Sequence, residues 1–234
     1  MHRYQILMEY VGTNFYGWQY QKKQITIQGT VEKTLKKILK EKVKLYGSGR
    51  TDSKVHAIEQ SAHFDVKNKI NNIKKFFNTL NFFLNRKFIT VVKIKKRPLT
   101  FHARYSAKKR IYKYLIHNRE SLPSINRDRG WYVRKKLDYK LIKKASHFLK
   151  GTHDLSVFRA SNCSASSPIR TIDSLIIKKN NDIIEIKIKS RSFLKQQVRS
   201  IVGCLKYVGE KKWTINRFKK VIESKNRNLC APPA

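Results

Sequence analysis

The stretch of this chain with the residue types best suited to chemistry is residues 47 to 56. It reads Gly-Ser-Gly-Arg-Thr-Asp-Ser-Lys-Val-His and lies between two apolar runs, Val43 to Tyr46 and Ile58 to Val66. Two glycines within three residues allow a sharp turn and a close approach to another molecule. Arg50 and Asp52 are two residues apart, so on an extended segment their side chains would share a face. A guanidinium there would keep the carboxylate ionised, and such an anion can act as a nucleophile or base.

The same spacing also fits a plain polar turn. Aspartate and serine favour turns, and the arginine would then simply be solvated. Because short motifs often match by accident, the spacing alone favours the turn. A functional role for these residues has to rest on the remainder of the chain.

The composition points to a globular protein with a polyanionic partner. The chain has 234 residues, of which 40% are hydrophobic and 11% aromatic, which excludes disorder by composition. Lys plus Arg number 53 against 15 for Asp plus Glu, a net charge of +38. Such a field attracts polyanions, nucleic acid first and an anionic membrane second. Biased coding-DNA composition would also explain part of the charge, since Lys, Ile and Asn are all frequent.

Neither a metal site nor a disulfide framework is indicated. The chain contains no CxxC pair, and its cysteines are odd in number and widely spaced: Cys163, Cys204 and Cys230. Three candidate histidines also lack metal-ligand spacing: His56, His63 and His102. The first residues lack a signal-peptide core, and no apolar run approaches the length of a membrane span. We expect a cytoplasmic protein in a reducing compartment.

Hydrophobic periodicity predicts two α+β halves with mainly antiparallel sheets. In the first half it predicts four strands and two helices: Tyr4–Tyr10, a helix capped by Thr30 to about Lys40, Val43–Tyr46, Ser61–Val66, a helix over Asn71–Leu84, and Phe88–Lys95. The aromatic loop Phe15–Gln19 is expected to pack in the core rather than touch RNA. Pro98 stops the preceding strand, so the predicted subdomains are residues 1–99 and 100–234.

The second half follows a similar pattern. The prediction comprises a strand over Arg110–Ile116, a basic loop over 118–136, a helix from an Asp138 cap to Lys150, a hairpin of Ile169–Ile177 and Ile183–Ile188, a helix over Phe193–Val208, and a last helix from a Thr214 cap to about Glu223.

Several blocks in fixed order carry a resemblance to a known family. They are Glu9–Gln19, Gln28-Gly29, Gly49–Ala57, Phe101–Ala107 with Arg110–Tyr112, Phe158–Ala160, and Phe193 with Val198–Gly203. Over essentially the whole chain they resemble the tRNA pseudouridine synthase A (TruA) family, whose signature G-R-T-D-A-G-V-H-A is similar to residues 49 to 57. The resemblance implies a pseudouridine-synthase-like α+β fold with the active-site cleft between two subdomains.

The resemblance also implies a reaction and a partner. The family isomerises uridine to pseudouridine in the tRNA anticodon arm, usually at positions 38 to 40, as a homodimer without metal or organic cofactor. By resemblance, Asp52 on the first subdomain is the catalytic carboxylate, and Arg50 helps to extrude the base. On the second, Tyr112 stacks on or acts next to the base, and Arg199 pairs with Asp52. The implied tRNA contacts are Phe101, His102, Ala103, Arg104, Tyr105, Asn162, Cys163, Ser164, Ala165 and Ser166.

Physical chemistry suits these roles. The base must leave the stack before its glycosidic bond is reached. A carboxylate in a closed site needs a guanidinium to offset its charge, and a tyrosine ring offers a stacking face for uracil. Taken singly, Tyr112 fits a sheet aromatic and Arg199 a solvated helix face.

The chain departs from the family pattern at four places. Ser53-Lys54 stands where the family has Ala-Gly, and a positive φ there would strain Lys54. Gln196 and Gln197 replace histidines, and Ser166 stands where a basic residue is common. The family usually has a closing apolar strand after the point where residues 231–234 stand, so we expect either that the sequence is truncated or that one sheet lacks a strand.

Two other functions compete with catalysis. One is a catalytically silent RNA-binding or tRNA-folding module that keeps the basic surface. The other is a glycoside hydrolase, which usually needs two carboxylates flanking the bond. The combination of Asp52, Tyr112 and Arg199 favours catalysis, because a binding module needs no such anion.

Overall fold

The computed structural model describes residues 1–234, which form two compact units, Met1–Ala107 and Lys108–Ala234. Each unit has its own hydrophobic core. The predicted α+β fold class is confirmed: the chain contains a four-stranded antiparallel sheet and a five-stranded mixed sheet, each with flanking helices. No helix is both long enough and apolar enough to cross a membrane.

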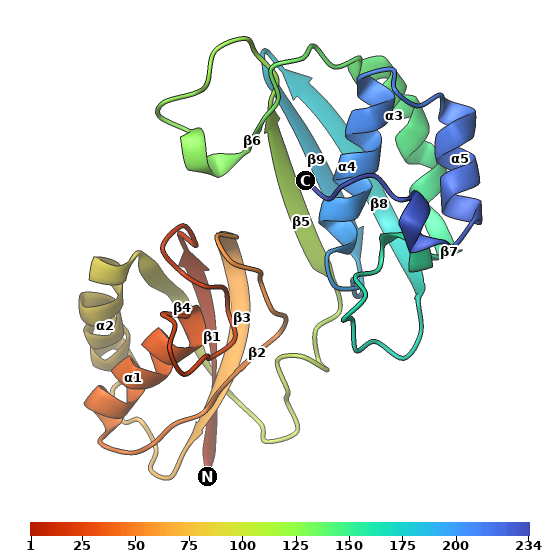
Figure 1. The fold of residues 1–234 in the computed structure, drawn as a ribbon. Coiled ribbons are helices and arrows are strands. Elements are labelled where there is room, and N and C mark those ends of the chain that lie inside the picture. The colour runs from red at the N-terminus through yellow and green to blue at the C-terminus, as the bar shows by residue number, and fades with distance from the viewer. The chain divides into compact units, whose positions relative to one another are not determined.

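The first unit is a four-stranded sheet with two helices on one face (Figure 1). Its elements are β1 (His2–Tyr10), α1 (Ile27–Leu39), β2 (Leu45–Gly47), β3 (Ala57–Val66), α2 (Ile73–Leu84), the 3₁₀ turn η1 (Asn85–Lys87) and β4 (Ile89–Arg97). The strands lie in the order β2-β3-β1-β4. Alternate residues of β1 are buried, as the period of two requires: Tyr4, Ile6, Met8 and Tyr10. The predicted order of strands and helices in this half is confirmed.

The start of α1 differs from the prediction. The cap is Thr26, whose hydroxyl accepts the N–H of Gly29 at 3.3 Å. Thr30 is buried inside the helix. The buried face of α1 already begins at Ile27, one turn before the apolar run that suggested the later start.

The second unit is a five-stranded sheet in the order β6-β5-β9-β8-β7. Its elements are β5 (Arg110–His117), η2 (Arg127–Arg129), β6 (Trp131–Tyr132), α3 (Tyr139–Ser146), η3 (His147–Leu149), β7 (Gly151–Asp154), η4 (Ser156–Phe158), β8 (Ile169–Asn180), β9 (Ile183–Ser190), α4 (Gln197–Gly209), α5 (Ile215–Glu223) and η5 (Arg227–Leu229). Helices α3, α4 and α5 lie on the same side of this sheet (Figure 1).

Caps at Asp138 and Thr214 are confirmed, each side chain accepting a backbone N–H of the first turn. Three features of the second unit differ from the prediction. The segment over 118–136 contains β6, which pairs in parallel with β5, and β7 was not predicted. Two to four residues are too short to show a hydrophobic period. Helix α4 begins at Gln197 rather than Phe193, because Gln196 takes a left-handed conformation with φ 60°.

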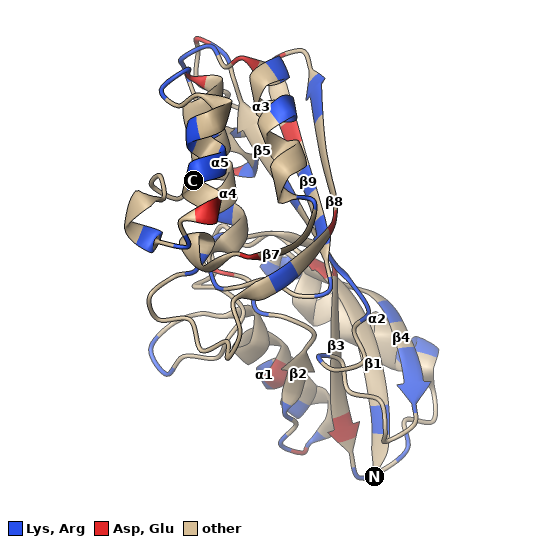
Figure 2. Ribbon diagram, turned by 90° about the vertical axis from the view of Figure 1, so that its right-hand side faces the viewer, with Lys and Arg blue, Asp and Glu red and all other residues tan.

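Basic residues occur on helices and strands of both units, whereas acidic residues are sparse (Figure 2). The polyanion partner inferred from composition therefore has basic surface available on either unit.

Candidate active site

Asp52 lies in the connection between β2 and β3, and this connection is a loop with a turn. The amide of Val55 donates to the carbonyl of Asp52 at 3.2 Å. Arg50 and Asp52 are both exposed, and no ion pair joins them. The polar turn that the spacing alone favours is therefore present, because the chain must reverse between two antiparallel strands.

The aromatic loop after β1 holds the backbone of the Asp52 loop. The amide of Trp18 donates to the carbonyl of Thr51 at 3.0 Å. On the other side of Asp52, the amide of Lys54 and the hydroxyl of Ser53 both donate to the carbonyl of Phe15 at 3.2 Å. The Phe15 and Trp18 side chains are buried, which confirms their predicted core role. Asp52 is thus exposed on a backbone fixed at both flanks.

Two glycines make this close approach possible: Gly17 in the aromatic loop and Gly12 shortly before it. A Cβ on Gly12 would lie 2.0 Å from the carbonyl oxygen of Val55. Gly17 has φ +85°, and a Cβ there would lie 2.8 Å from the carbonyl oxygen of Thr51. Neither glycine is among the predicted site residues. Glycines flanking an aromatic pair were the available signal, but their partner lies some 40 residues away in the chain.

Lys54 has φ 66°, the left-handed conformation that a Cβ disfavours. This is the strain foreseen where the family signature has glycine. We expect Lys54→Gly to raise the free energy of unfolding by about 1 kcal/mol, measured by urea denaturation. Lys54→Ala is the matched control, because it removes the charge and keeps the Cβ. An equal gain in both variants would show that the side chain, not the backbone, is responsible.

A buried histidine attaches the segment of residues 101 to 105 to the first unit. Nδ1 of His63 on β3 accepts the N–H of Ala103 at 3.1 Å. The His63 ring stacks on Tyr46 with centroids 5.0 Å apart, and its edge-on partner His102 lies at 4.7 Å. Arg104 and Tyr105 are exposed, whereas the side chain of Ala103 is buried. Of the predicted tRNA contacts in this segment, Arg104 and Tyr105 offer the most open side chains.

An ion pair fastens the start of the same segment. Arg3 binds both carboxylate oxygens of Asp65 at 2.7 Å. It also donates to the carbonyls of Leu99 and Phe101, each at 2.5 Å. Residues that follow the predicted subdomain boundary at 99/100 therefore pack on the first sheet.

Burial, reinforced by the charges of Arg3 and His102, lowers the pKa of His63 to about 4. Between pH 6.5 and about pH 4, His63 is therefore protonated in the unfolded chain but mostly neutral in the folded chain. We expect the free energy of unfolding to be highest above pH 6.5 and to fall by about 2–3 kcal/mol toward pH 4. The lowered pKa of His102 acts in the same direction. The Arg3 hydrogen bonds lower the pKa of Asp65. Protonation of Asp65 therefore lowers the free energy of unfolding only at still lower pH.

Urea denaturation at several pH values measures this slope. In His63→Gln the slope between pH 4 and 6.5 should largely disappear, while His147→Gln, at an exposed position, should keep it. An unchanged slope in His63→Gln would assign the pH dependence to other groups.

On the second unit, Tyr112 lies on β5 and Arg199 lies near the start of α4. The half-buried Tyr112 packs edge-to-face on Phe193 with centroids 4.9 Å apart. Burial raises the pKa of Tyr114, and the charge of Arg199 opposes that rise. Nε of Arg199 donates to the carbonyl of Ala234 at 2.5 Å. Part of the guanidinium is thus committed to the end of the chain.

The loop of residues 162 to 166 is held from inside the same unit. Arg159 donates to the carbonyls of Cys163 and Ala165 at 2.8 and 2.7 Å. The three other residues of the loop are exposed: Asn162, Ser164 and Ser166. Arg159 therefore fixes the backbone and leaves these polar side chains open.

The predicted site residues are thus divided between the units. Asp52, Arg50 and residues 101 to 105 belong to the first, and Tyr112, Arg199 and residues 162 to 166 to the second. No group of three His, Cys, Asp or Glu side chains in the chain is arranged to hold a metal ion.

Comparison with known proteins gives matches along the whole chain. A family model described as tRNA pseudouridine synthase matches residues 6–106 and 145–234. The chain is 59% identical over 234 residues to tRNA pseudouridine synthase A of Pelagibacter ubique, covering 100% of this chain and 95% of that protein. Identity to the proteins of the same name is 43% over 236 residues in Thermoanaerobacter sp. and 38% over 236 residues in Sinorhizobium fredii. These matches cover 100% of this chain and 96% and 95% of those proteins.

Proposed function

The chain belongs to the tRNA pseudouridine synthase family of isomerases, and from this premise we propose that it converts uridine to pseudouridine at positions 38 to 40 of the tRNA anticodon arm, with Asp52 as the catalytic carboxylate. The observation that carries the proposal is the setting of Asp52. Its side chain is exposed, while hydrogen bonds to the aromatic loop hold the backbone on both sides of it. A carboxylate held in this way is preorganised for a target that comes from outside.

The reaction needs little else from the protein. The bond between C1′ of the ribose and N1 of uracil breaks, the base turns, and a bond between C1′ and C5 forms. The C5 proton is released and N1 takes up a proton, so the product is an isomer. The Asp52 anion acts at the sugar as nucleophile or base, on a uridine that has left the stack.

The other predicted residues act on the base and the backbone in this proposal. Arg50 helps to extrude the uridine, and Tyr112 stacks on or acts next to it, supported by its contact with Phe193. Arg199 offsets the charge of Asp52 with the guanidinium nitrogens that Ala234 does not occupy. Residues 101 to 105 and 162 to 166 contact the tRNA.

The enzyme acts in this proposal as a homodimer in the cytoplasm, where its tRNA substrate is found. Analytical ultracentrifugation of the purified chain at micromolar concentration tests the assembly. A single species near the dimer mass supports it, and a monomer that is active overturns it.

The experiment that tests the proposed function maps pseudouridine in unmodified tRNA transcripts. Three transcripts each keep uridine at only one of positions 38, 39 and 40, and a fourth keeps none there. After incubation with the purified chain, chemical derivatisation and primer extension locate the product. Product in the first three and none in the fourth is expected. Binding without product in any transcript would favour the catalytically silent RNA-binding module.

A further inference from the structure

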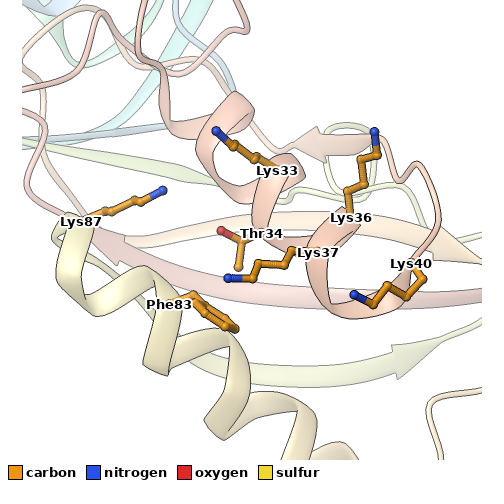
Figure 3. Close-up of a pocket in the computed structure, with 7 residues that line it drawn as sticks. All are labelled: Lys33, Thr34, Lys36, Lys37, Lys40, Phe83 and Lys87. Atoms are coloured by element: carbon orange, nitrogen blue, oxygen red, sulfur yellow. The ribbon is translucent and has the colours of Figure 1, made fainter.

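A hollow of about 540 Å³ lies against α1 and α2 of the first unit, and none of the residues that line it is a predicted site residue (Figure 3). Five of the seven residues that line it are lysines: Lys33, Lys36, Lys37, Lys40 and Lys87. The other two are the buried Thr34 and the half-buried Phe83. No acidic residue lines the hollow, and none of these lysines forms an ion pair.

The lysines of α1 form one stripe. Lys33, Lys36 and Lys37 have the spacing i, i+3, i+4, which places them on one face of α1, and Lys40 is the C-cap residue that follows the helix. Like charges at this spacing destabilise a helix. Cations near its C-terminal end gain from the helix dipole, which accounts for Lys36, Lys37 and Lys40. The dipole accounts for neither Lys33, earlier in α1, nor Lys87, which comes from η1.

Two of the lysine side chains extend into a common space. Figure 3 shows Lys37 and Lys87 extending toward the gap between the two helices, with Lys36 turned away from α2. Nζ of Lys37 lies 4.2 Å from the centre of the Phe83 ring. An anion in this space would meet several ammonium groups at once and would relieve their mutual repulsion.

We propose that this lysine hollow binds backbone phosphates of the tRNA substrate outside the anticodon arm. The proposal rests on the proposed function for the identity of the RNA. A polyanionic strand suits the row of charges, because it presents phosphates in succession along a groove. Its contacts position the tRNA without reading sequence.

The test compares two triple variants of the full-length chain. Lys33→Gln, Lys37→Gln and Lys87→Gln together remove three ammonium groups from the hollow while keeping side chains that are long and polar. The matched control changes three exposed lysines of α3, Lys140, Lys143 and Lys144, to Gln. Dissociation constants are measured for a full-length tRNA transcript and for its isolated anticodon stem-loop, at several salt concentrations.

We expect the hollow variant to bind full-length tRNA about tenfold more weakly, and its log–log salt slope to decrease by about 0.9 for each phosphate that it no longer binds. Its affinity for the stem-loop should stay within about twofold of wild type, as should the affinity of the α3 control for both RNAs. Equal reductions of affinity in the two variants, or for the two RNAs, would overturn the proposal. The proposal would also be overturned if the hollow variant lost affinity only for vesicles that contain anionic phospholipid and kept its affinity for both RNAs.

A second measurement needs no variant. Lysine acetylation of the wild-type chain, read by mass spectrometry, should slow at Lys33, Lys37 and Lys87 when full-length tRNA is added and not at the α3 lysines. Unchanged acetylation of the hollow lysines contradicts the proposal even if the variant fails to fold. Both readouts report binding, so a chain that binds tRNA here but makes no pseudouridine overturns only the proposed function.

Discussion

Asp52→Asn should abolish pseudouridine formation while leaving tRNA binding intact. The amide keeps the shape of the carboxylate but cannot serve as an anion at C1′ of the ribose. Loss of a group of this kind costs about four to six orders of magnitude in turnover. Because Asp52 is exposed and its neighbours hold the loop through the backbone, we expect the free energy of unfolding to change by less than about 0.5 kcal/mol.

Single-turnover assays with an unmodified transcript measure the loss of turnover, and filter binding measures the affinity. Asp173→Asn is the matched control, since it removes an exposed carboxylate from β8 of the second unit. It should leave both quantities unchanged. An Asp52→Asn variant with more than about a hundredth of wild-type turnover would remove Asp52 from the chemistry.

Gly17→Ala should damage catalysis more than stability. Its φ of +85° disfavours any Cβ, and the added methyl would meet the carbonyl of Thr51 at 2.8 Å. The carbonyl belongs to the residue before Asp52 and is held by the amide of Trp18, so relief of the clash moves the carboxylate. A misplacement of about 1 Å costs about a hundredfold in rate. The backbone strain itself costs about 1–2 kcal/mol in folding free energy.

Gly151→Ala separates these two effects. Gly151 also has a positive φ, +105°, but a Cβ there would meet only the His153 ring at 3.6 Å. We expect a loss of stability comparable to that of Gly17→Ala, measured by urea denaturation, with unchanged single-turnover rate. If the two variants lose the same amount of activity, general destabilisation explains both, and Gly17 has no special part in placing Asp52.

The role proposed for the lysine hollow differs from the role proposed for Asp52. In the two proposals, Asp52 acts on one nucleotide, whereas the lysine hollow binds backbone phosphates elsewhere in the tRNA. If both proposals are correct, substitution of the hollow lysines should raise KM for full-length tRNA and leave kcat unchanged, because phosphate contacts position the RNA before reaction.

The amino-acid sequence by itself determined the fold class, the order of elements in the first unit and three helix starts. Helix caps and hydrophobic periods are local patterns, so Asp138 and Thr214 could be read directly, as could the start of α2 near Asn72. Burial of Phe15 and Trp18 also followed from residue type. The ordered blocks of residues established the family before any coordinates. The subdomain boundary and the roles of the site residues stay predictions.

Only the tertiary structure decided how the candidate site is supported. The aromatic loop and the Asp52 loop are neighbours through hydrogen bonds between residues almost 40 positions apart in the sequence. His63 accepts a hydrogen bond from Ala103, which lies 40 positions later in the sequence. The short strand β6 exists because β5 offers it a pairing edge. The positive φ of Lys54 accompanies the hydrogen bond that its backbone N–H donates to the carbonyl of Phe15. Contacts of this kind depend on how distant segments pack, and a local period in the sequence carries no record of them.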